Sequence, residues 1–330
     1  MSGRDLDAAG ITNPALRAGF EQARRLNARY GRTFYLSTLM LPTARRPFVH
    51  ALYGFARYAD DIVDELPPRV AEPRLRDWSR QVLAEIEWAA SSEPLVRAVI
   101  ETVRRYALPV SYFADFLESM AADLTVTQYP TEADLDGYMW GSAAVIGLQM
   151  LPILGRRDAS IRWDELEPYA IELGRAFQLT NFIRDVGEDL DRGRIYLPGQ
   201  TMRDYGVDAD RLRRRRVDEP IRNLLAHEID RARGMYARAA PGIDLVDERA
   251  ADCLRVAWRL YSDILTEVER ADYDVFSGRL SVTLAHRAAV ATPAALRIAV
   301  RARPSWRGSA VSARIRRADP RRGRRRSAGR

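Results

Sequence analysis

Two acidic patterns contain the side chains of this chain that are best suited to chemistry. The first holds Asp60 and Asp64, and the second holds Asn181, Asp185 and Asp189. On an α-helix, residues four apart share one face with their Cβ atoms about 6 Å from each other, so each pattern can act as a cluster of oxygen ligands. Mg²⁺ prefers such ligands and is commonly held by carboxylates together with substrate phosphates. The spacing therefore predicts metal-assisted binding of a phosphate-bearing substrate.

The residues next to these carboxylates extend the same two polar faces. Tyr53 and Arg57 share a helical sector with the first pair, and Gln178 shares one with the second pattern. Arg184 adds a fixed cation that is suited to phosphate. Apolar side chains form a second stripe about a third of a turn away on each helix. We expect two helices that pack through the apolar stripe and present the polar stripe to a cavity.

The elements that must position these residues are predicted to be helices. Helical periodicity appears near residues 12–30, 32–41, 47–65, 72–90, 92–106, 109–125, 132–151, 161–190, 218–239, 246–271 and 281–303. No strand, repeat or hairpin signal is present in the sequence. Because no Pro/Gly/Ser-rich linker interrupts this pattern, we predict an all-α fold with one domain over residues 1–303.

A segment in the middle of the chain, residues 138–154, is apolar on nearly every side and is predicted to be a buried helix. Interrupted by Gln149 and Pro152, it is expected to be too short to span a bilayer. Small residues between Gly141 and Gly147 keep one side of this helix thin. From the residues alone, close helix packing and a substrate tunnel are equally good explanations.

The sequence resembles the squalene/phytoene synthase family of head-to-head isoprenoid synthases, most closely the bacterial phytoene synthases. Besides both aspartate motifs, the resemblance depends on residues 33–35, 41–53, 138–148, 173–181 and 191–198. Two departures are Gly31, where the family often has serine, and Ser142-Ala143-Ala144 in place of Val-Ala-Gly. The resemblance implies an isoprenoid synthase-type helical bundle around a central cavity.

The same resemblance implies the activity of a 15-cis-phytoene synthase in carotenoid biosynthesis. In that reaction two geranylgeranyl diphosphates condense 1-1′ through a cyclopropyl diphosphate, prephytoene diphosphate, and no NADPH is consumed. The implied catalytic residues are Asp60, Asp64, Asp185 and Asp189. Together with Asn181 they are the implied ligands of Mg²⁺, for which Mn²⁺ is an alternative.

The family also implies which residues bind the two prenyl diphosphate substrates. They are Thr33, Phe34, Tyr53, Arg57, Tyr138, Gly147, Gln178, Asn181, Arg184, Tyr261 and Arg279. A cationic intermediate must be kept from water, so a dry cavity lined by Phe34, Phe177, Leu148 and Trp140 is expected. Residues 193–198, just after the second motif, are expected to form a mobile flap.

Positive charge is concentrated at the C-terminal end. The formal net charge is +7, and the last thirty residues contain twelve arginines and one acid, Asp319. Residues 304–330 are predicted to be a disordered tail, and three roles stay open: binding anionic lipid, contacting nucleic acid without specificity, or none. The N-terminus has no apolar segment typical of a signal peptide, so a cytoplasmic protein is predicted, with the inner face of the plasma membrane as a peripheral site.

Several alternatives to phytoene synthesis are considered. A squalene or dehydrosqualene synthase would act on farnesyl diphosphate, and a non-catalytic helical scaffold would bind membranes through its tail. A di-iron bundle needs Glu-x-x-His pairs, and His50, His227 and His286 are not so placed. Contact with other carotenoid-pathway enzymes is expected because the product is insoluble. The single cysteine, Cys253, is predicted to be a small core residue.

Overall fold

The computed structural model describes residues 2–301, except for the side chains of residues 2, 33, 295, 296 and 298–301. Its α-helices are α1 (Ser2–Ala8), α2 (Pro14–Tyr30), α3 (Arg32–Thr38), α4 (Arg46–Glu65), α5 (Pro68–Glu87), α6 (Pro94–Tyr106), α7 (Val110–Ala122), α8 (Glu132–Met139), α9 (Val145–Leu154), α10 (Trp163–Arg184), α11 (Val186–Asp191), α12 (Gly199–Asp204), α13 (Ala209–Arg213), α14 (Glu219–Ala239), α15 (Glu248–Arg270) and α16 (Leu284–Arg301). A π-helical turn, η1 (Trp140–Ala144), joins α8 to α9, and a 3₁₀ turn, η2 (Ala240–Asp244), follows α14. The predicted tail, residues 304–330, lies outside the described residues.

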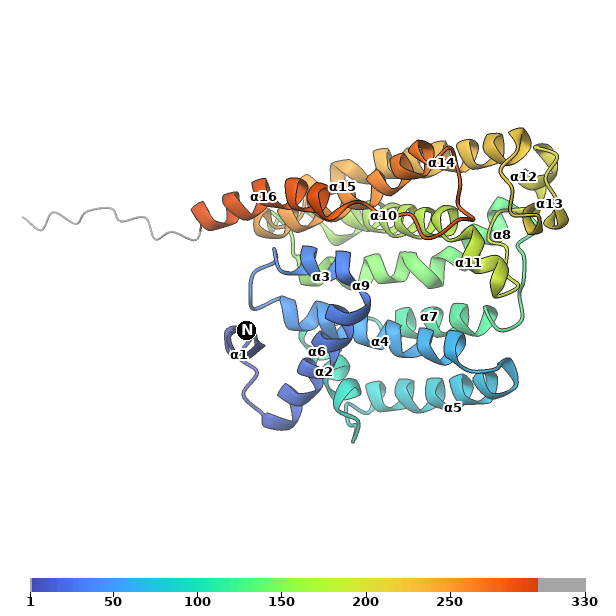
Figure 1. Ribbon diagram of the computed structural model, residues 1–330. Helices are drawn as coiled ribbons and strands as arrows, with labels where there is room; N and C mark the ends of the chain where they lie inside the picture. The colour runs from blue at the N-terminus through green and yellow to red at the C-terminus, as the bar shows by residue number, and fades with distance from the viewer. Residues whose placement is uncertain (1, 302–330) are drawn as a thin grey trace, which may run out of the picture.

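The helices form two halves with the second aspartate motif between them (Figure 1). Helices α14, α15 and α16 run along one side, and α2, α5 and α6 lie on the other. Helix α10 packs on α14, α9 and α15, whereas α2 packs on α4 and α6. The two largest hydrophobic clusters follow this division. Within residues 2–301 there is no strand, and pairing is limited to two isolated bridges, so the all-α prediction is confirmed.

Helix α4 is the element that carries the first aspartate motif, and its sequence explains its bounds. Pro47 occupies the first turn, where a missing backbone N–H costs nothing. The predicted apolar stripe is buried, including Phe55, Ala59 and Ile62. The helix ends at Glu65, before two consecutive prolines whose rings cannot continue it. The carboxylates of Asp60 and Asp64 lie on the other, half-buried face of the helix.

The predicted single helix over residues 161–190 is wrong at one position. Asp185 leaves the helical conformation with φ −100° and ψ 13°, so that it ends α10 and begins α11. Gly187, a poor helix former, lies two residues later, and a Cβ there would lie 2.8 Å from the carbonyl oxygen of Val275. Helices α1, α12 and α13 are absent from the prediction because each is too short to show a clear period.

The stretch Glu132–Leu154 is a continuous helical run of 23 residues, and its most apolar window of 18 residues has a mean hydropathy of 1.3. By length and composition it could therefore cross a membrane, and the expectation that it is too short is wrong. However, 61% of its most apolar window is buried inside the protein, as in a core helix. Gly141 permits this burial, because a Cβ there would lie 2.3 Å from the carbonyl oxygen of Asp115.

Candidate active site

The first motif lies on a half-buried edge of α4, where an arginine partly neutralises it. Nη1 of Arg57 donates to Asp60 over 3.0 Å, and its other terminal nitrogen pairs with Asp61. Burial, and after it the negative charge of Asp64, raises the pKa of Asp60 to about 6. Carboxylates that repel each other in this way favour a cation between them. Asp60 and Asp64 therefore lie close enough on α4 for their charges to interact, as their i, i+4 spacing predicts.

The second motif lies at the break between α10 and α11. Asp185 accepts a hydrogen bond from Nε of Arg184 over 2.7 Å and another from Arg279 over 3.3 Å. Asp189 is buried, and burial together with the charge of Asp185 raises its pKa to about 8. The Asn181 carbonyl accepts the backbone N–H of Asp185 over 2.8 Å, so the i, i+4 spacing survives the break.

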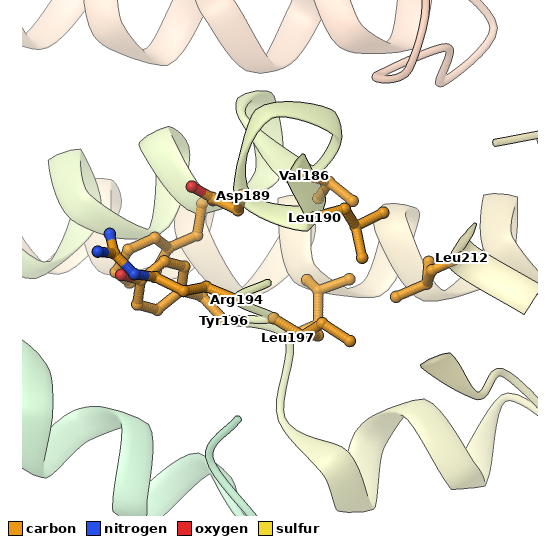
Figure 2. A pocket seen from close by; sticks show the side chains of 9 residues that line it. Val186, Asp189, Leu190, Arg194, Tyr196, Leu197 and Leu212 are labelled. Atoms are coloured by element: carbon orange, nitrogen blue, oxygen red, sulfur yellow. The ribbon is translucent and has the colours of Figure 1, made fainter. Parts of the chain in front are cut away.

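The two motifs meet through arginines that follow the second one. Nη1 of Arg194 donates to Asp64 over 3.1 Å, and Arg192 lies 3.5 Å from the other oxygen of that carboxylate. The backbone N–H of Arg194 donates to the carbonyl oxygen of Asp189 over 2.8 Å. Figure 2 shows the side chains of Asp189 and Arg194 reaching to the same side. The guanidinium of Arg194 thus pairs with the first motif, while its backbone is bonded to the backbone of the second.

An apolar cavity of about 320 Å³ lies between the two halves of the protein. Its polar wall includes Tyr53, Gln178 and Asn181, which share helical faces with the two aspartate motifs. Most other lining residues are apolar and come from α3, α4, α9, α10, α14 and α15. The cavity therefore joins the cluster of carboxylates to a space suited to a hydrocarbon chain.

The predicted substrate-binding residues fall into two groups. Phe34, Tyr53, Gly147, Gln178 and Asn181 line the cavity. The arginines predicted to bind diphosphate lie instead among the carboxylates and are ion-paired there: Arg57, Arg184 and Arg279. The side chain of Thr33 lies outside the part of the chain that the structure describes.

Tyr261 and Tyr138 occupy different places from each other. The ring of Tyr261 packs on Phe34 and Phe177 with centroid distances of 5.0 and 4.5 Å, so it supports the cavity wall from behind. Tyr138 does not line the cavity, and its hydroxyl donates to Asp123 over 2.8 Å. Its buried side chain lies among the aromatic rings of Tyr129, Phe182 and Tyr196.

One expectation about the cavity lining needs correction. Phe34 and Phe177 line it as predicted, but Trp140 and Leu148 do not. Trp140 is 37% exposed and its indole Nε1 donates to Asp115, because the π-helical turn rotates it outward. In the segment predicted to be a mobile flap, residues 193–198, the N–H of Ile195 donates to the carbonyl oxygen of Thr127 over 2.8 Å, and its mobility stays a prediction.

Sequence reasoning missed three residues next to the motifs. Asp123 accepts hydrogen bonds from the hydroxyls of both Tyr138 and Tyr196 over 2.8 Å. Arg194, which reaches Asp64, lies outside both acidic patterns. The resemblance covers the segment containing Arg194 and Tyr196, and an arginine close after the second acidic motif was the available signal. Asp123 has no local signal, because its partners are distant in the sequence.

The donor set fits a hard divalent cation. All five predicted ligands offer oxygen, and Oδ1 of Asn181 is buried with no hydrogen-bond partner among the described residues. Its Nδ2 donates to Gln178 over 3.4 Å, which turns the amide oxygen away from that partner. A buried acceptor without a donor costs free energy that a bound cation would recover. Mg²⁺ therefore suits this set of residues.

A second group of potential ligands lies at a distance from the motifs. Atoms of Glu132, His227 and Glu228 lie within 4.8 Å of one another. Arg231 already occupies this group, with contacts of 3.4 Å to Glu132 and 3.0 Å to Glu228. Ion pairing accounts for this arrangement.

Comparison with known proteins agrees with this geometry. The profile of the family described as squalene/phytoene synthase matches residues 27–286, which include both aspartate motifs and the cavity. The chain belongs to the squalene/phytoene synthase family. It is 34% identical to the 15-cis-phytoene synthase of Synechococcus elongatus over 278 residues, which covers 81% of this chain and 89% of that protein. It is 35% identical to the phytoene synthase of Arthrospira platensis over 284 residues, which covers 82% and 91%.

Solved structures of this squalene/phytoene synthase family share the fold. A dehydrosqualene synthase in complex with a ligand superposes with a TM-score of 0.79 at 27% identity, covering 86% of this chain and 98% of that one. A squalene synthase from Alicyclobacillus acidocaldarius gives a TM-score of 0.73 at 28% identity, covering 81% and 99%. The protein is accordingly an enzyme of the prenyltransferase type with the isoprenoid synthase helical fold.

Proposed function

We propose that this enzyme is a 15-cis-phytoene synthase that joins two geranylgeranyl diphosphates 1-1′ by way of a cyclopropyl diphosphate. The observation that carries the proposal is that Arg194 links the two aspartate motifs, by its guanidinium to Asp64 and by its backbone N–H to the carbonyl oxygen of Asp189, beside an apolar cavity of about 320 Å³. Similarity to phytoene synthases over more than four-fifths of the chain supports the choice of product.

Five residues would hold Mg²⁺ in this proposal: Asp60, Asp64, Asn181, Asp185 and Asp189. Bound there, the metal would supply positive charge that offsets the leaving diphosphate. Arg57, Arg184 and Arg279 already pair with these carboxylates and can turn to diphosphate oxygens when substrate enters. In this proposal the protein's residues thus concentrate positive charge at one end of the cavity.

The apolar wall serves the second half of the chemistry. Loss of diphosphate leaves an allylic cation, which water would trap if it could reach it. Phe34 and Phe177 face each other with ring centroids 6.1 Å apart, and the ring of Tyr261 closes the wall behind them. In the proposed reaction the cation then alkylates the double bond of the second substrate, and loss of a proton closes the cyclopropyl diphosphate. Departure of its diphosphate, rearrangement to the linear 1-1′ skeleton and loss of a second proton complete phytoene without NADPH.

The test is to incubate the purified protein with geranylgeranyl diphosphate and Mg²⁺ in the absence of NADPH and to identify the extracted hydrocarbon by mass. The proposal predicts a forty-carbon product that disappears when the metal is chelated. No hydrocarbon in the presence of Mg²⁺ would contradict it.

A thirty-carbon product is the second candidate, because the dehydrosqualene synthase structure superposes with a TM-score of 0.79. Farnesyl diphosphate in the same assay, with and without NADPH, separates the two candidates. Preferential use of farnesyl diphosphate would move the assignment to dehydrosqualene synthesis, or to squalene synthesis if NADPH is consumed.

We also propose that the Arg-rich tail holds the enzyme against anionic lipid in the cytoplasm, close to where an insoluble product must go. Each basic residue near such a surface contributes about 1 kcal/mol. Sedimentation with vesicles containing anionic lipid should pull down the full chain but much less of a chain ending at Arg303. Equal sedimentation of the two would contradict the proposal, and neutral vesicles serve as the control.

A further inference from the structure

We propose that Asp123 is a positioning residue for the reaction: its carboxylate, through Tyr138 and Tyr196, fixes the segment that carries Arg194, so that its backbone carbonyl oxygen holds the Arg194 guanidinium in reach of Asp64. The inference rests on the proposed function, because Asp64 is one of the residues that would bind Mg²⁺. Asp123 follows directly after α7 and belongs to neither acidic motif. Its hydrogen-bond partners come from segments that are distant in the sequence.

Asp123 joins two segments that are distant in the sequence. Its Oδ2 accepts the hydroxyl of Tyr138 on α8, and its Oδ1 accepts the hydroxyl of Tyr196, both over 2.8 Å. Its backbone carbonyl oxygen accepts Nε of Arg194 over 3.1 Å. One residue thus fixes α8 and the segment after α11 with three hydrogen bonds.

The contact with Arg194 sets the direction of its guanidinium. Nε donates to Asp123 while Nη1 donates to Asp64 over 3.1 Å. Because the guanidinium is planar and rigid, fixing Nε decides where Nη1 points. The side chains of Arg194 and Asp64 are only 13% and 16% exposed, so water competes weakly for these bonds. A shift at Asp123 therefore reaches a predicted metal ligand through a single side chain.

The contact with Tyr196 fixes a second part of the site. The ring of Tyr196 stacks on Phe182 with a centroid distance of 4.1 Å and an interplanar angle of 9°. Phe182 directly follows the predicted ligand Asn181 on α10. By holding Tyr196, the carboxylate of Asp123 therefore also supports the part of α10 that contributes to the metal site.

A purely structural role is the rival explanation. Burial raises the pKa of Asp123 to about 6, against the two tyrosine hydrogen bonds, which lower it. A buried acceptor of this kind stabilises a fold by itself, and removing it leaves two hydroxyls without a partner. The experiment must therefore measure the Mg²⁺ requirement of the enzyme as well as its folding.

The test compares Asp123→Asn with Asp115→Asn in the full-length protein. Asp115 lies on α7 and also accepts a hydrogen bond from an aromatic side chain, Nε1 of Trp140 over 2.9 Å, so it is a matched control. Residues that orient metal ligands typically cost about tenfold to a hundredfold in metal affinity or activity when changed. We expect Asp123→Asn to raise the Mg²⁺ concentration for half-maximal activity by about tenfold and to lower kcat, and Asp115→Asn to leave both unchanged.

A double variant shows whether the effect passes through Arg194. If Asp123 acts by orienting this arginine, Asp123→Asn combined with Arg194→Gln should be about as impaired as Arg194→Gln alone, because coupled residues are not additive. If the double variant instead loses activity by the product of the two single-variant factors, the inference is overturned. Should Asp123→Asn fail to fold, Tyr196→Phe removes one hydroxyl only, and an unchanged Mg²⁺ requirement in that variant would also overturn it.

The outcomes separate this inference from the function on which it rests. An inactive wild-type enzyme would overturn both. An active wild-type enzyme whose Mg²⁺ requirement matches that of a folded Asp123→Asn variant would overturn the role of Asp123 alone.

Discussion

The guanidinium of Arg194 donates a hydrogen bond to Asp64 over 3.1 Å, although the two residues are 130 positions apart in the chain. The backbone N–H of the same arginine donates to the carbonyl oxygen of Asp189. This relationship brings the two acidic patterns of the sequence to one place. It also offsets part of their negative charge, since four aspartates close together repel one another.

The acidic residue at the helix break should be essential, whereas its neighbour at the end of α11 should not. Asp185 accepts hydrogen bonds from Arg184 and Arg279 and is a predicted metal ligand, while the side chain of Asp191 is 66% exposed and pairs with Arg215. We expect Asp185→Asn to lower kcat/KM about a hundredfold or more, as for loss of a charge that is needed in the transition state. Asp191→Asn should stay within about twofold of wild type, since exposed ion pairs contribute little.

Steady-state kinetics at saturating Mg²⁺ check this prediction. Circular dichroism spectra of both variants control for folding. Equal activity of the two variants would show that the position at the break has no special role.

Acid pH should destabilise the fold through a buried histidine. His50 is 2% exposed, and its Nδ1 lies 3.0 Å from Nδ2 of Asn27. Burial lowers the pKa of His50 to about 3. Between the ordinary pKa of about 6.5 and this value, the unfolded chain binds a proton that the folded chain does not. This contribution is complete above about pH 6.5 and falls by at most about 1.4 kcal/mol per pH unit below it.

Urea unfolding at pH 7.5 and 5.5 measures this effect in wild type and in His50→Gln. The variant should lose part of the pH dependence of the free energy of unfolding, whatever its absolute stability. His227→Gln is the control, because that side chain is 39% exposed. An identical pH dependence in wild type and His50→Gln would refute the argument.

The size of the cavity should limit the length of the prenyl chain. Ala257 on α15 lines the cavity and is 6% exposed. In Ala257→Phe a phenyl ring fills space that the longer chain needs more than the shorter one. One methylene in an apolar pocket changes specificity by about 1–3 kcal/mol, so we expect the preference for geranylgeranyl over farnesyl diphosphate to fall by about tenfold or more.

The measurement is the ratio of the kcat/KM values for the two substrates. Ala257→Ser serves as a size control and should keep the wild-type ratio. Thermal unfolding checks for overpacking, which typically costs about 1–3 kcal/mol. A ratio that does not change in a folded Ala257→Phe variant would show that this part of the cavity does not contact the chain end.

Periodicity predicted the fold well wherever one face of a long helix is buried. Helix α4 was expected over residues 47–65 and spans Arg46–Glu65, because its apolar stripe, its initial proline and the prolines after it agree. The break at Asp185 could not be predicted in the same way. Close by, the backbone around Val275, almost ninety residues later in the chain, packs against Gly187, and a local pattern does not encode such a contact.

The site was predictable to the extent that its ligands share a helical face. Tyr53, Gln178 and Asn181 lie where their spacing from the aspartates placed them. Tyr138 was assigned to substrate; its hydroxyl donates to Asp123 in this structure, and the assignment stays a prediction. Such pairing is decided by tertiary packing, which a local pattern does not encode.

The most direct test of the central claim is a competition between substrates. Equimolar geranylgeranyl and farnesyl diphosphates are supplied to the full-length enzyme with Mg²⁺ and without NADPH, and the hydrocarbons are separated by mass. The proposed function predicts that forty-carbon phytoene dominates and that Asp60→Asn and Asp185→Asn abolish it. A dominant thirty-carbon product, or hydrocarbon formation that survives both substitutions, would contradict it.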